Sequence, residues 1–356
     1  KSLKLRLRSD VPLAFCLSGG VDSASLVSLA AKEFNYDVST FSIIDSDKRY
    51  NELENIQATV NDIGCKSFKV KLDSNNDNIT RLENLVKYHD APVATISYFV
   101  HSILSEAIAS KGFKISVSGT GADEIFSGYY DHFNLHLNEI KEDKDFNKYL
   151  LDWKTFTHKY VRHPDLKKYD LYFKNPKLRS HIYLNNNYFS DFLKTPFKEG
   201  FTEKKYTSSL LRNRMMNEMF HEVVRVILHE DDLNSMFYSL ENRSPFLDRE
   251  LFEFVYSIPS KLLIKNGYAK YLLRESMSGV LNDKVRLDRE KKGFNASINS
   301  IIDFKNKNHI EYLLDDSKVF DFVNKEKIET LLKRKEYSNS FKKFIFNFIN
   351  VKIFLS

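Results

Sequence analysis

The sequence predicts an α/β fold built on a parallel sheet and followed by a largely helical C-terminal part. Strand-like apolar runs alternate with helix-like segments through the first 118 residues. A glycine-rich segment comes directly after the first apolar run, and aromatic, helix-like sequence dominates beyond residue 132. Such alternation implies parallel strands joined by crossover helices. Ligands of these sheets bind at the carboxyl ends of the strands, so that edge should hold the site.

The expected elements follow one another closely along the chain. Strands are predicted where β-branched and aromatic residues gather, over residues 11–17, 38–44, 67–72 and 114–118. Helices are predicted where apolar residues recur at helical spacing, over residues 24–34, 51–63, 79–88 and 98–110. Residues 132–230 are interpreted as a helical core and lid, and residues 341–354 as an apolar-rich helix that covers the core or a partner domain.

Length and composition limit the possible classes. A chain of 356 residues with 42% hydrophobic content can bury a full core in two domains or one large α/β domain. No apolar run reaches the ~18 residues of a membrane span and no signal peptide opens the chain, so we expect a cytoplasmic protein without membrane contact. Cys16 and Cys65 are too few for a disulfide framework. The net charge of +6 is spread out, which does not indicate nucleic-acid binding.

The segment Leu17-Ser18-Gly19-Gly20-Val21-Asp22-Ser23 carries the most information. Glycines let the backbone approach an anion with its N–H groups, and a helix that begins near Val21 adds its positive dipole end. The spacing fits neither the Walker nor the dinucleotide pattern. Ser-Gly-Gly alone is also a common flexible turn, but the preceding strand, the acidic residue and the following helix favour a phosphate-binding loop.

A second glycine-rich loop follows the strand predicted over residues 114–118. It reads Ser-Gly-Thr-Gly-Ala-Asp-Glu from Ser118. Both loops fall at strand ends and can line one crevice, so Asp22 and Asp123 could hold Mg²⁺, which prefers a few carboxylates together with water and phosphate oxygens. In the alternative reading, Asp123 and Glu124 are charges that stabilise a helix N-terminus.

Four motifs together resemble a known family. The first loop is similar to the PP-loop of ATP pyrophosphatases, which cleave ATP between the α and β phosphates. The loops, residues 235–248 and residues 270–275 occur in the order seen in the synthetase domain of glutamine-dependent asparagine synthetases. Residues 8–12 and 291–294 also look like that family, so the resemblance spans residues 6 to about 297.

The resemblance implies an adenine nucleotide α-hydrolase-like fold and an amide-forming reaction. A carboxylate, with aspartate as the leading acceptor, reacts with ATP to give an acyl-adenylate and pyrophosphate, and ammonia then releases AMP. The implied organisation is an ATP-binding core over residues 1–130, a helical insertion or lid over 131–230, and the remaining motifs with a helical end over 231–356. The implied cofactors are ATP and Mg²⁺.

Carried over by position, the resemblance also assigns residues on the ATP side. It implies that the pyrophosphate is held by Ser18, Gly19, Gly20, Asp22 and Ser23. It places the adenosine among Leu17, Ile43, Ser118 and Gly119. Asp22 and Asp123 would bind the metal, and Lys270 matches the family's essential lysine near the α-phosphate, so Lys270 and Asp123 are the expected catalytic residues. Lys292 is a weaker pyrophosphate candidate that could equally be a surface charge.

The acceptor side departs from the family pattern. Glu241 and Arg243 are expected to border the acceptor or to form a structural ion pair. Leu233 stands where an arginine is common, which removes a bidentate anion donor. Thr120 stands where the family usually has an acidic residue that handles the incoming amine, and threonine cannot act as a base near neutral pH. Another acceptor, such as a uronic-acid sugar or an amino-acid derivative, is therefore a serious alternative.

The expected partners follow from the same resemblance. Glutamine-using members begin with a glutaminase domain whose nucleophile is an N-terminal cysteine, whereas this sequence begins at Lys1 without one. We expect ammonia from a missing glutaminase domain or from a partner, and a homodimer is possible. Two other classes stay open: a PP-loop enzyme that modifies tRNA, and an inactive nucleotide-binding scaffold.

Overall fold

The centre of the molecule is a parallel sheet. The computed structural model describes residues 1–179, 181–182, 186–195, 202–291, 293, 295–334 and 338–356. In this part of the chain the strands lie in the order β3-β2-β1-β4-β5. They are β1 (Leu13–Cys16), β2 (Ser39–Ile44), β3 (Lys66–Lys71), β4 (Ile115–Val117) and β5 (Glu241–Arg243). All pairings between these five strands are parallel, which confirms the predicted fold class.

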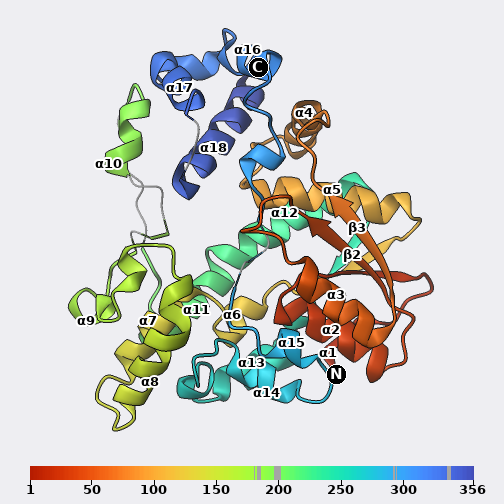
Figure 1. Cartoon of the computed structure of the whole chain (residues 1–356), viewed down its shortest axis with the longest axis vertical. Helices are drawn as coiled ribbons and strands as arrows, with labels where there is room; N and C mark the ends of the chain where they lie inside the picture. The colour runs from red at the N-terminus through yellow and green to blue at the C-terminus, as the bar shows by residue number, and fades with distance from the viewer. Residues whose placement is uncertain (180, 183–185, 196–201, 292, 294, 335–337) are drawn as a thin grey trace.

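The helices surround this sheet and form most of the second half of the chain (Figure 1). Those within the first half are α1 (Ser2–Arg6), α2 (Val21–Lys32), α3 (Leu53–Ile63), α4 (Asn78–His89), α5 (Ile96–Ser110), α6 (Ala122–Phe126), α7 (Tyr130–Glu139), α8 (Phe146–Asp152) and α9 (Leu171–Lys174). Those that follow are α10 (Asn186–Phe189), α11 (Leu210–Phe220), α12 (Val223–Phe237), α13 (Arg249–Ser257), α14 (Tyr271–Ser276), α15 (Asp283–Arg286), α16 (Lys307–Leu314), α17 (Lys325–Leu332) and α18 (Asn339–Leu355).

The two faces of the sheet are covered by different helices. Successive side chains of a strand point to opposite faces, so alternate residues of β1 enter different cores. Leu13 and Phe15 pack with α2 and α3, whereas Ala14 packs with Phe41 and with α5. Figure 1 shows α2 and α3 on one side of the strands and α5 with α12 on the other. The sheet is therefore buried on both faces, as its apolar strands require.

The order of the strands in the sheet brings the two glycine-rich loops to one edge. β1 is central, because Phe15 lies opposite Thr40 of β2 on one side and Val117 of β4 on the other. The loops after β1 and β4 therefore leave the sheet side by side at its carboxyl edge. This is the position at which open parallel sheets bind ligands.

The C-terminal helices form a further core cluster against α4. Leu85 and Val86 of α4 are buried together with Ile345 and Ile349 of α18. The helix predicted over residues 341–354 is confirmed and covers another part of this chain. Met215 and Met219 of α11 are also buried, in the cluster that contains β1. Within the described residues, no helix combines the length and the apolar character that crossing a membrane requires.

Candidate active site

The loop between β1 and α2 is closed by its own hydroxyl groups. The backbone N–H of Ser18 donates to Ser23 Oγ at 3.0 Å, and that of Gly20 donates to Ser18 Oγ at 3.2 Å. Gly19 has no room for a side chain, because a Cβ there would lie 2.6 Å from the Cβ of Glu52. The loop is thus compact and leads directly into the first turn of α2, where free backbone N–H groups suit an anion.

The loop after β4 lies directly against the first loop. A Cβ on Gly119 would lie 3.0 Å from the backbone N of Ser23 and 3.1 Å from the Cβ of Asp22. Glycine is required here by close approach of the two backbones. Gly121 has φ of +92°, a left-handed conformation that favours glycine, and precedes α6. The second loop therefore turns sharply and delivers Asp123 towards Asp22.

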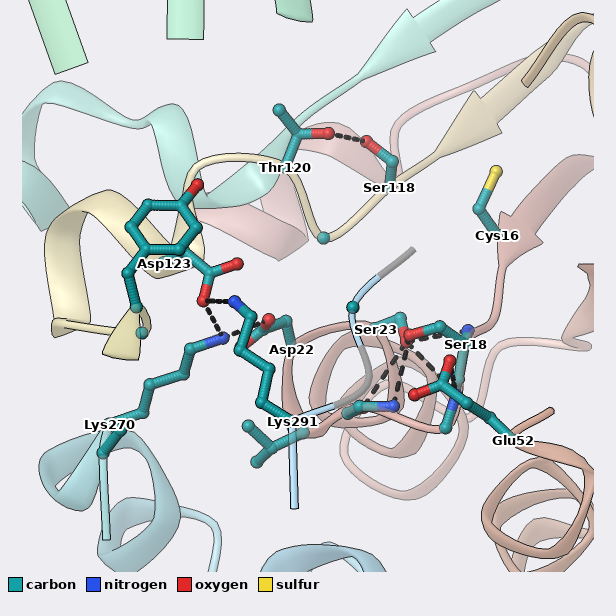
Figure 2. A pocket seen from close by; sticks show the side chains of 18 of the residues that line it. Cys16, Ser18, Asp22, Ser23, Glu52, Ser118, Thr120, Asp123, Lys270 and Lys291 are labelled. Carbon is teal, nitrogen blue, oxygen red and sulfur yellow. Dashed lines mark hydrogen bonds and ion pairs between the residues drawn. The ribbon is translucent and has the colours of Figure 1, made fainter. Parts of the chain in front are cut away.

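Two lysines bind the carboxylates that these loops present (Figure 2). The ammonium of Lys270 contacts Asp22 and lies 2.8 Å from Asp123 Oδ1, and Lys291 also pairs with Asp123. Lys270 is only 5% exposed. Its burial alone would lower the pKa of Lys270, but Asp123 and Asp22 outweigh it and raise the pKa above the usual value. Both lysines likewise hold the pKa of Asp123 well below its usual range despite burial.

The carboxylate of Asp22 has capacity for a further cation. Its Oδ2 contacts Lys270, whereas its Oδ1 is buried and has no hydrogen-bond partner among the described residues. Burying an unpaired carboxylate oxygen is costly. Asp22 and Asp123 share one lysine, so they are close neighbours that can supply oxygen ligands to Mg²⁺. The two carboxylates therefore fit a magnesium ion, although the lysine ammonium groups already compensate much of the negative charge of these carboxylates.

All of these groups line one cavity of about 400 Å³. That volume lies in the range of small-molecule sites. The predicted residues that line it are Leu17, Ser18, Gly19, Gly20, Asp22, Ser23, Ile43, Ser118, Gly119, Thr120, Asp123 and Lys270. Residues from sequence positions as far apart as 17 and 270 thus meet at the carboxyl edge of the sheet.

Two predicted acceptor residues lie elsewhere. Glu241 and Arg243 belong to β5 and pair with each other at 2.7 Å, and they are not part of the cavity lining. Arg243 Nη1 donates to the backbone oxygens of Arg6 and Arg8 at 2.7 and 2.8 Å. Of the two expectations, an acceptor border or a structural ion pair, the geometry matches the ion pair, because it ties β5 to the N-terminal segment. Lys292 lies outside the described residues.

Several lining residues were not singled out from the sequence. Lys291, next to the predicted Lys292, has its ammonium 4.6 Å from the ring centre of Tyr129. Tyr129 donates to Glu124, and burial together with the neighbouring Asp123 raises the pKa of Glu124 to about 7. His101 of α5 lines the same cavity. The Lys-Lys pair and the helical spacing of α5 were the available signals.

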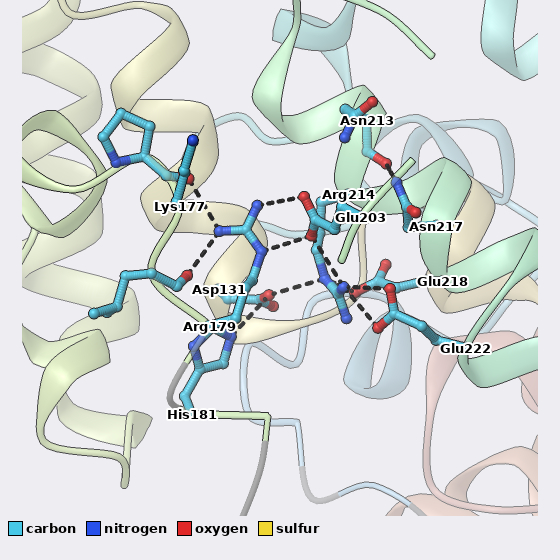
Figure 3. A network of polar contacts seen from close by, with 12 residues as sticks. Asp131, Lys177, Arg179, His181, Glu203, Asn213, Arg214, Asn217, Glu218 and Glu222 are labelled. Atoms are coloured by element: carbon cyan, nitrogen blue, oxygen red, sulfur yellow. Dashed lines mark hydrogen bonds and ion pairs between the residues drawn. The ribbon is translucent and has the colours of Figure 1, made fainter. Parts of the chain in front are cut away.

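A separate buried network joins α7 to α11 (Figure 3). Asp131, His132 and Glu218 bring ligand-type atoms within 4.8 Å of one another, as a metal site would. However, Arg214 Nε lies 3.0 Å from Glu218 and 3.8 Å from Asp131, and His132 Nε2 lies 2.8 Å from Glu218. The guanidinium supplies the positive charge that these carboxylates need. The cluster is therefore an internal ion-pair network.

The chain is similar to known proteins over most of its length. Residues 1–350 match the family model described as asparagine synthase. The chain is similar to asparagine synthetase 1 (glutamine-hydrolyzing) of Bacillus subtilis strain 168, at 32% identity over 316 residues covering 83% of this chain and 48% of that protein. Asparagine synthetase 3 (glutamine-hydrolyzing) of the same organism is 28% identical over 310 residues, covering 81% and 46%. Amidase chyE of Penicillium rubens is more distant, at 24% over 341 residues, covering 80% and 49%. The chain thus spans about half the length of these relatives.

Proposed function

The chain belongs to the asparagine synthase family, and we propose that it catalyses ATP-dependent amide formation. A carboxylate is adenylated and ammonia then replaces AMP, with aspartate as the leading acceptor and asparagine, AMP and pyrophosphate as products. The observation that carries the proposal is the position of Lys270. Its buried ammonium lies between Asp22 and Asp123, one from each glycine-rich loop, in a cavity of small-molecule size.

The backbone of the first loop is suited to the pyrophosphate part of ATP. The loop residues Ser18, Gly19 and Gly20 precede the 12-residue helix α2, whose N-terminus carries unpaired N–H groups and a positive dipole end. Ser23 is buried beneath the loop and fixes its shape through Ser18. The adenosine is assigned to the apolar wall with Leu17 and Ile43.

Asp22 and Asp123 are the residues that would hold Mg²⁺. The buried, unpartnered Oδ1 of Asp22 supports this assignment. When bound, the ion would neutralise phosphate oxygens and make the α-phosphorus more electrophilic. The protein contributes two carboxylates on separate loops, and the close packing of Gly119 on Asp22 fixes their separation.

Lys270 and Lys291 supply the positive charge for the reaction itself. In the first step a carboxylate oxygen attacks the α-phosphorus, and the electron pair of the broken bond leaves with pyrophosphate. Negative charge accumulates on the phosphoryl oxygens, so preorganised ammonium groups stabilise the transition state. Removing one such donor typically costs about 10²–10³ in rate. The raised pKa of Lys270 keeps it charged at neutral pH.

A second candidate function uses the same chemistry with a different acceptor carboxylate. Thr120 Oγ1 lies 3.0 Å from Ser118 Oγ, so the central position of this loop offers hydroxyl groups where an acid would offer a carboxylate. This observation favours the same chemistry on another carboxylate, such as a uronic-acid sugar or an amino-acid derivative. The nitrogen would come from a glutaminase domain or a partner, or from free ammonia.

The test is pyrophosphate release from ATP with Mg²⁺ and ammonium, screened over aspartate, other amino acids and uronic acids. We expect one carboxylate to stimulate release and Lys270→Ala to abolish the stimulation. Stimulation by aspartate assigns an asparagine synthetase reaction, and stimulation by another acid reassigns the acceptor. No stimulation by any carboxylate, together with no binding of ATP, would overturn the proposal in favour of a scaffold.

A further inference from the structure

His101 brings a second type of chemistry into the cavity. It lies on α5, whose residues Tyr98 and Leu104 also line the cavity. The two lysines of the cavity come from the second half of the chain. Its Nδ1 is 2.6 Å from Oδ1 of Asp231 on α12. The side chain of Asp231 is 6% exposed and that of His101 is 25% exposed. A buried carboxylate thus orients an imidazole that reaches the cavity.

The helices α5 and α12 hold this pair in place. Asn234, one helical turn after Asp231, donates from Nδ2 to the backbone oxygen of Tyr98 at 2.9 Å. The backbone oxygen of Asp231 accepts from Asn242 Nδ2 at 3.0 Å, which ties α12 to β5. The pair is therefore fixed to the sheet from two sides.

The carboxylate sets the chemical state of the imidazole. When Asp231 accepts the Nδ1 proton, the neutral ring keeps its lone pair on Nε2, the form that accepts a proton. Titratable groups near this wall are Asp231 and Glu230 on α12, Tyr98 on α5, Cys16 at the end of β1 and Glu124 on α6. Burial would lower the pKa of His101, but Asp231 outweighs it and raises the pKa above 6.5.

The proposed reaction needs a proton acceptor that the two loops do not supply. Asp22 and Asp123 are engaged by lysines, and Glu124 accepts from Tyr129. Thr120 carries a hydroxyl group, which is not a base near neutral pH. An attacking amine must nevertheless lose a proton before the amide is stable.

We propose that His101, oriented by Asp231, accepts the proton that the attacking amine loses. This inference rests on the proposed function. The amine nitrogen attacks the acyl carbon of the adenylate, and the carbonyl π electrons move to oxygen. An N–H proton passes to Nε2 of His101. The C=O bond then re-forms, the bond to the phosphate oxygen breaks, AMP leaves with that electron pair, and the imidazolium returns its proton to solvent.

The inference separates two half-reactions. Adenylation does not use the amine, so His101→Ala should change aspartate-dependent exchange of pyrophosphate into ATP less than about 3-fold, within the range of a lost polar contact. Amide formation should fall by about 100-fold, the lower end of general-base contributions. Asp231→Asn should lower amide formation by about 10–100-fold, as loss of an orienting partner does. His229→Gln, an exposed histidine of α12, is the matched control and should match the wild type.

The experiment uses the full chain with aspartate, or glucuronate if aspartate is inert, and with ammonium or hydroxylamine as nucleophile. Both nucleophiles titrate, so the wild type and His101→Ala are compared with the same nucleophile, and the difference between their pH profiles reports the enzyme. We expect the wild-type rate of amide formation to rise with pH through the raised pKa of His101, and His101→Ala to lose that ionisation. Added imidazole should restore amide formation in His101→Ala.

Three results would overturn the inference. They are an unchanged pH profile in His101→Ala, an equal loss of exchange and amide formation, or a rise in the acceptor KM without rescue by imidazole. The last two would make His101 a structural or acceptor-binding residue. Absence of exchange in the wild type with every carboxylate is a different result, because it removes the proposed function itself.

Discussion

Substituting Gly128 by alanine should disable the site by displacing Asp123. Gly128 follows α6, and a Cβ there would lie 1.7 Å from Asp123 Oδ1 and 2.4 Å from Lys270 Cε. Carbon contacts are comfortable at about 3.5 Å. The carboxylate oxygen must therefore move by about 1.5 Å, which separates it from its two lysine partners. The φ angle of Gly128 is outside the left-handed range, so alanine adds no backbone strain.

The expected magnitude follows from that displacement. A misplacement of about 1 Å in a reacting group costs about 100-fold in rate, equivalent to about 2.7 kcal/mol. The assay is carboxylate-dependent pyrophosphate release in Gly128→Ala and wild type, together with thermal unfolding of both. We expect kcat/KM to fall about 100-fold with little change in Tm, because Asp123 and Lys270 face the cavity and can move without repacking the core.

Gly64→Ala is the matched control for this substitution. Gly64 ends α3 with φ of +66°, and among the described residues nothing beyond its chain neighbours lies within 4 Å of a Cβ placed there. Alanine there should cost about 1 kcal/mol of stability through backbone strain and leave the rate unchanged. Gly128→Ala should therefore lose rate and keep its stability, whereas Gly64→Ala should lose stability and keep its rate. Wild-type rates in a folded Gly128→Ala protein would refute the assigned geometry of Asp123.

The remaining predictions concern charge. Lys270→Ala should bind ATP with an affinity within a few fold of wild type and lose about 10²–10³ in pyrophosphate release, and unchanged turnover would remove Lys270 from the mechanism. Asp123→Asn should make the ATP affinity measured by calorimetry insensitive to Mg²⁺, whereas a retained Mg²⁺ response would exclude this carboxylate as a ligand. His136 is buried, and its burial lowers the pKa of the imidazole to about 4, so the folded state resists its protonation. The contribution of the neutral His136 imidazole to the free energy of unfolding is complete above pH 6.5 and is lost as the pH falls towards 4. The free energy of unfolding should fall for this reason by about 2 kcal/mol between pH 7.5 and 5. His136→Leu should reduce that loss in urea unfolding, and an identical pH dependence in both proteins would contradict the assignment.

The fold was predictable where the pattern is local. Apolar runs and helical spacing located four strands and the main helices of the first half to within a few residues, as with β1, which begins at Leu13 rather than residue 11. β5 was missed because Glu241–Arg243 is short and polar. Its conformation depends on pairing with β4, where Ile115 lies opposite Glu241. No local periodicity encodes that contact.

The site was predictable where a motif fixes its own geometry. The two glycine-rich loops do so, because each is short and follows a strand of the sheet. Lys270, at the start of α14, was predicted through the family resemblance. The pair of His101 and Asp231 was missed because 130 residues separate its members. Helix packing creates that pair, and a single histidine in a helical segment does not indicate which carboxylate it will meet.

The backbone of Lys270 offers a last test of how the site is held. Lys270 adopts φ of +55°, a left-handed conformation that costs a non-glycine residue about 1–2 kcal/mol. The structure retains it because Arg274 N–H donates to Lys270 O at 3.0 Å while the side chain pairs with two carboxylates. Lys270→Gly and Lys270→Ala lose the same ion pairs, so glycine should be more stable than alanine by about 1 kcal/mol in urea unfolding. The order should reverse at the adjacent Tyr271, which is helical. Equal stability at both positions would mean that the strain is absent and that the ion pairs alone place the ammonium.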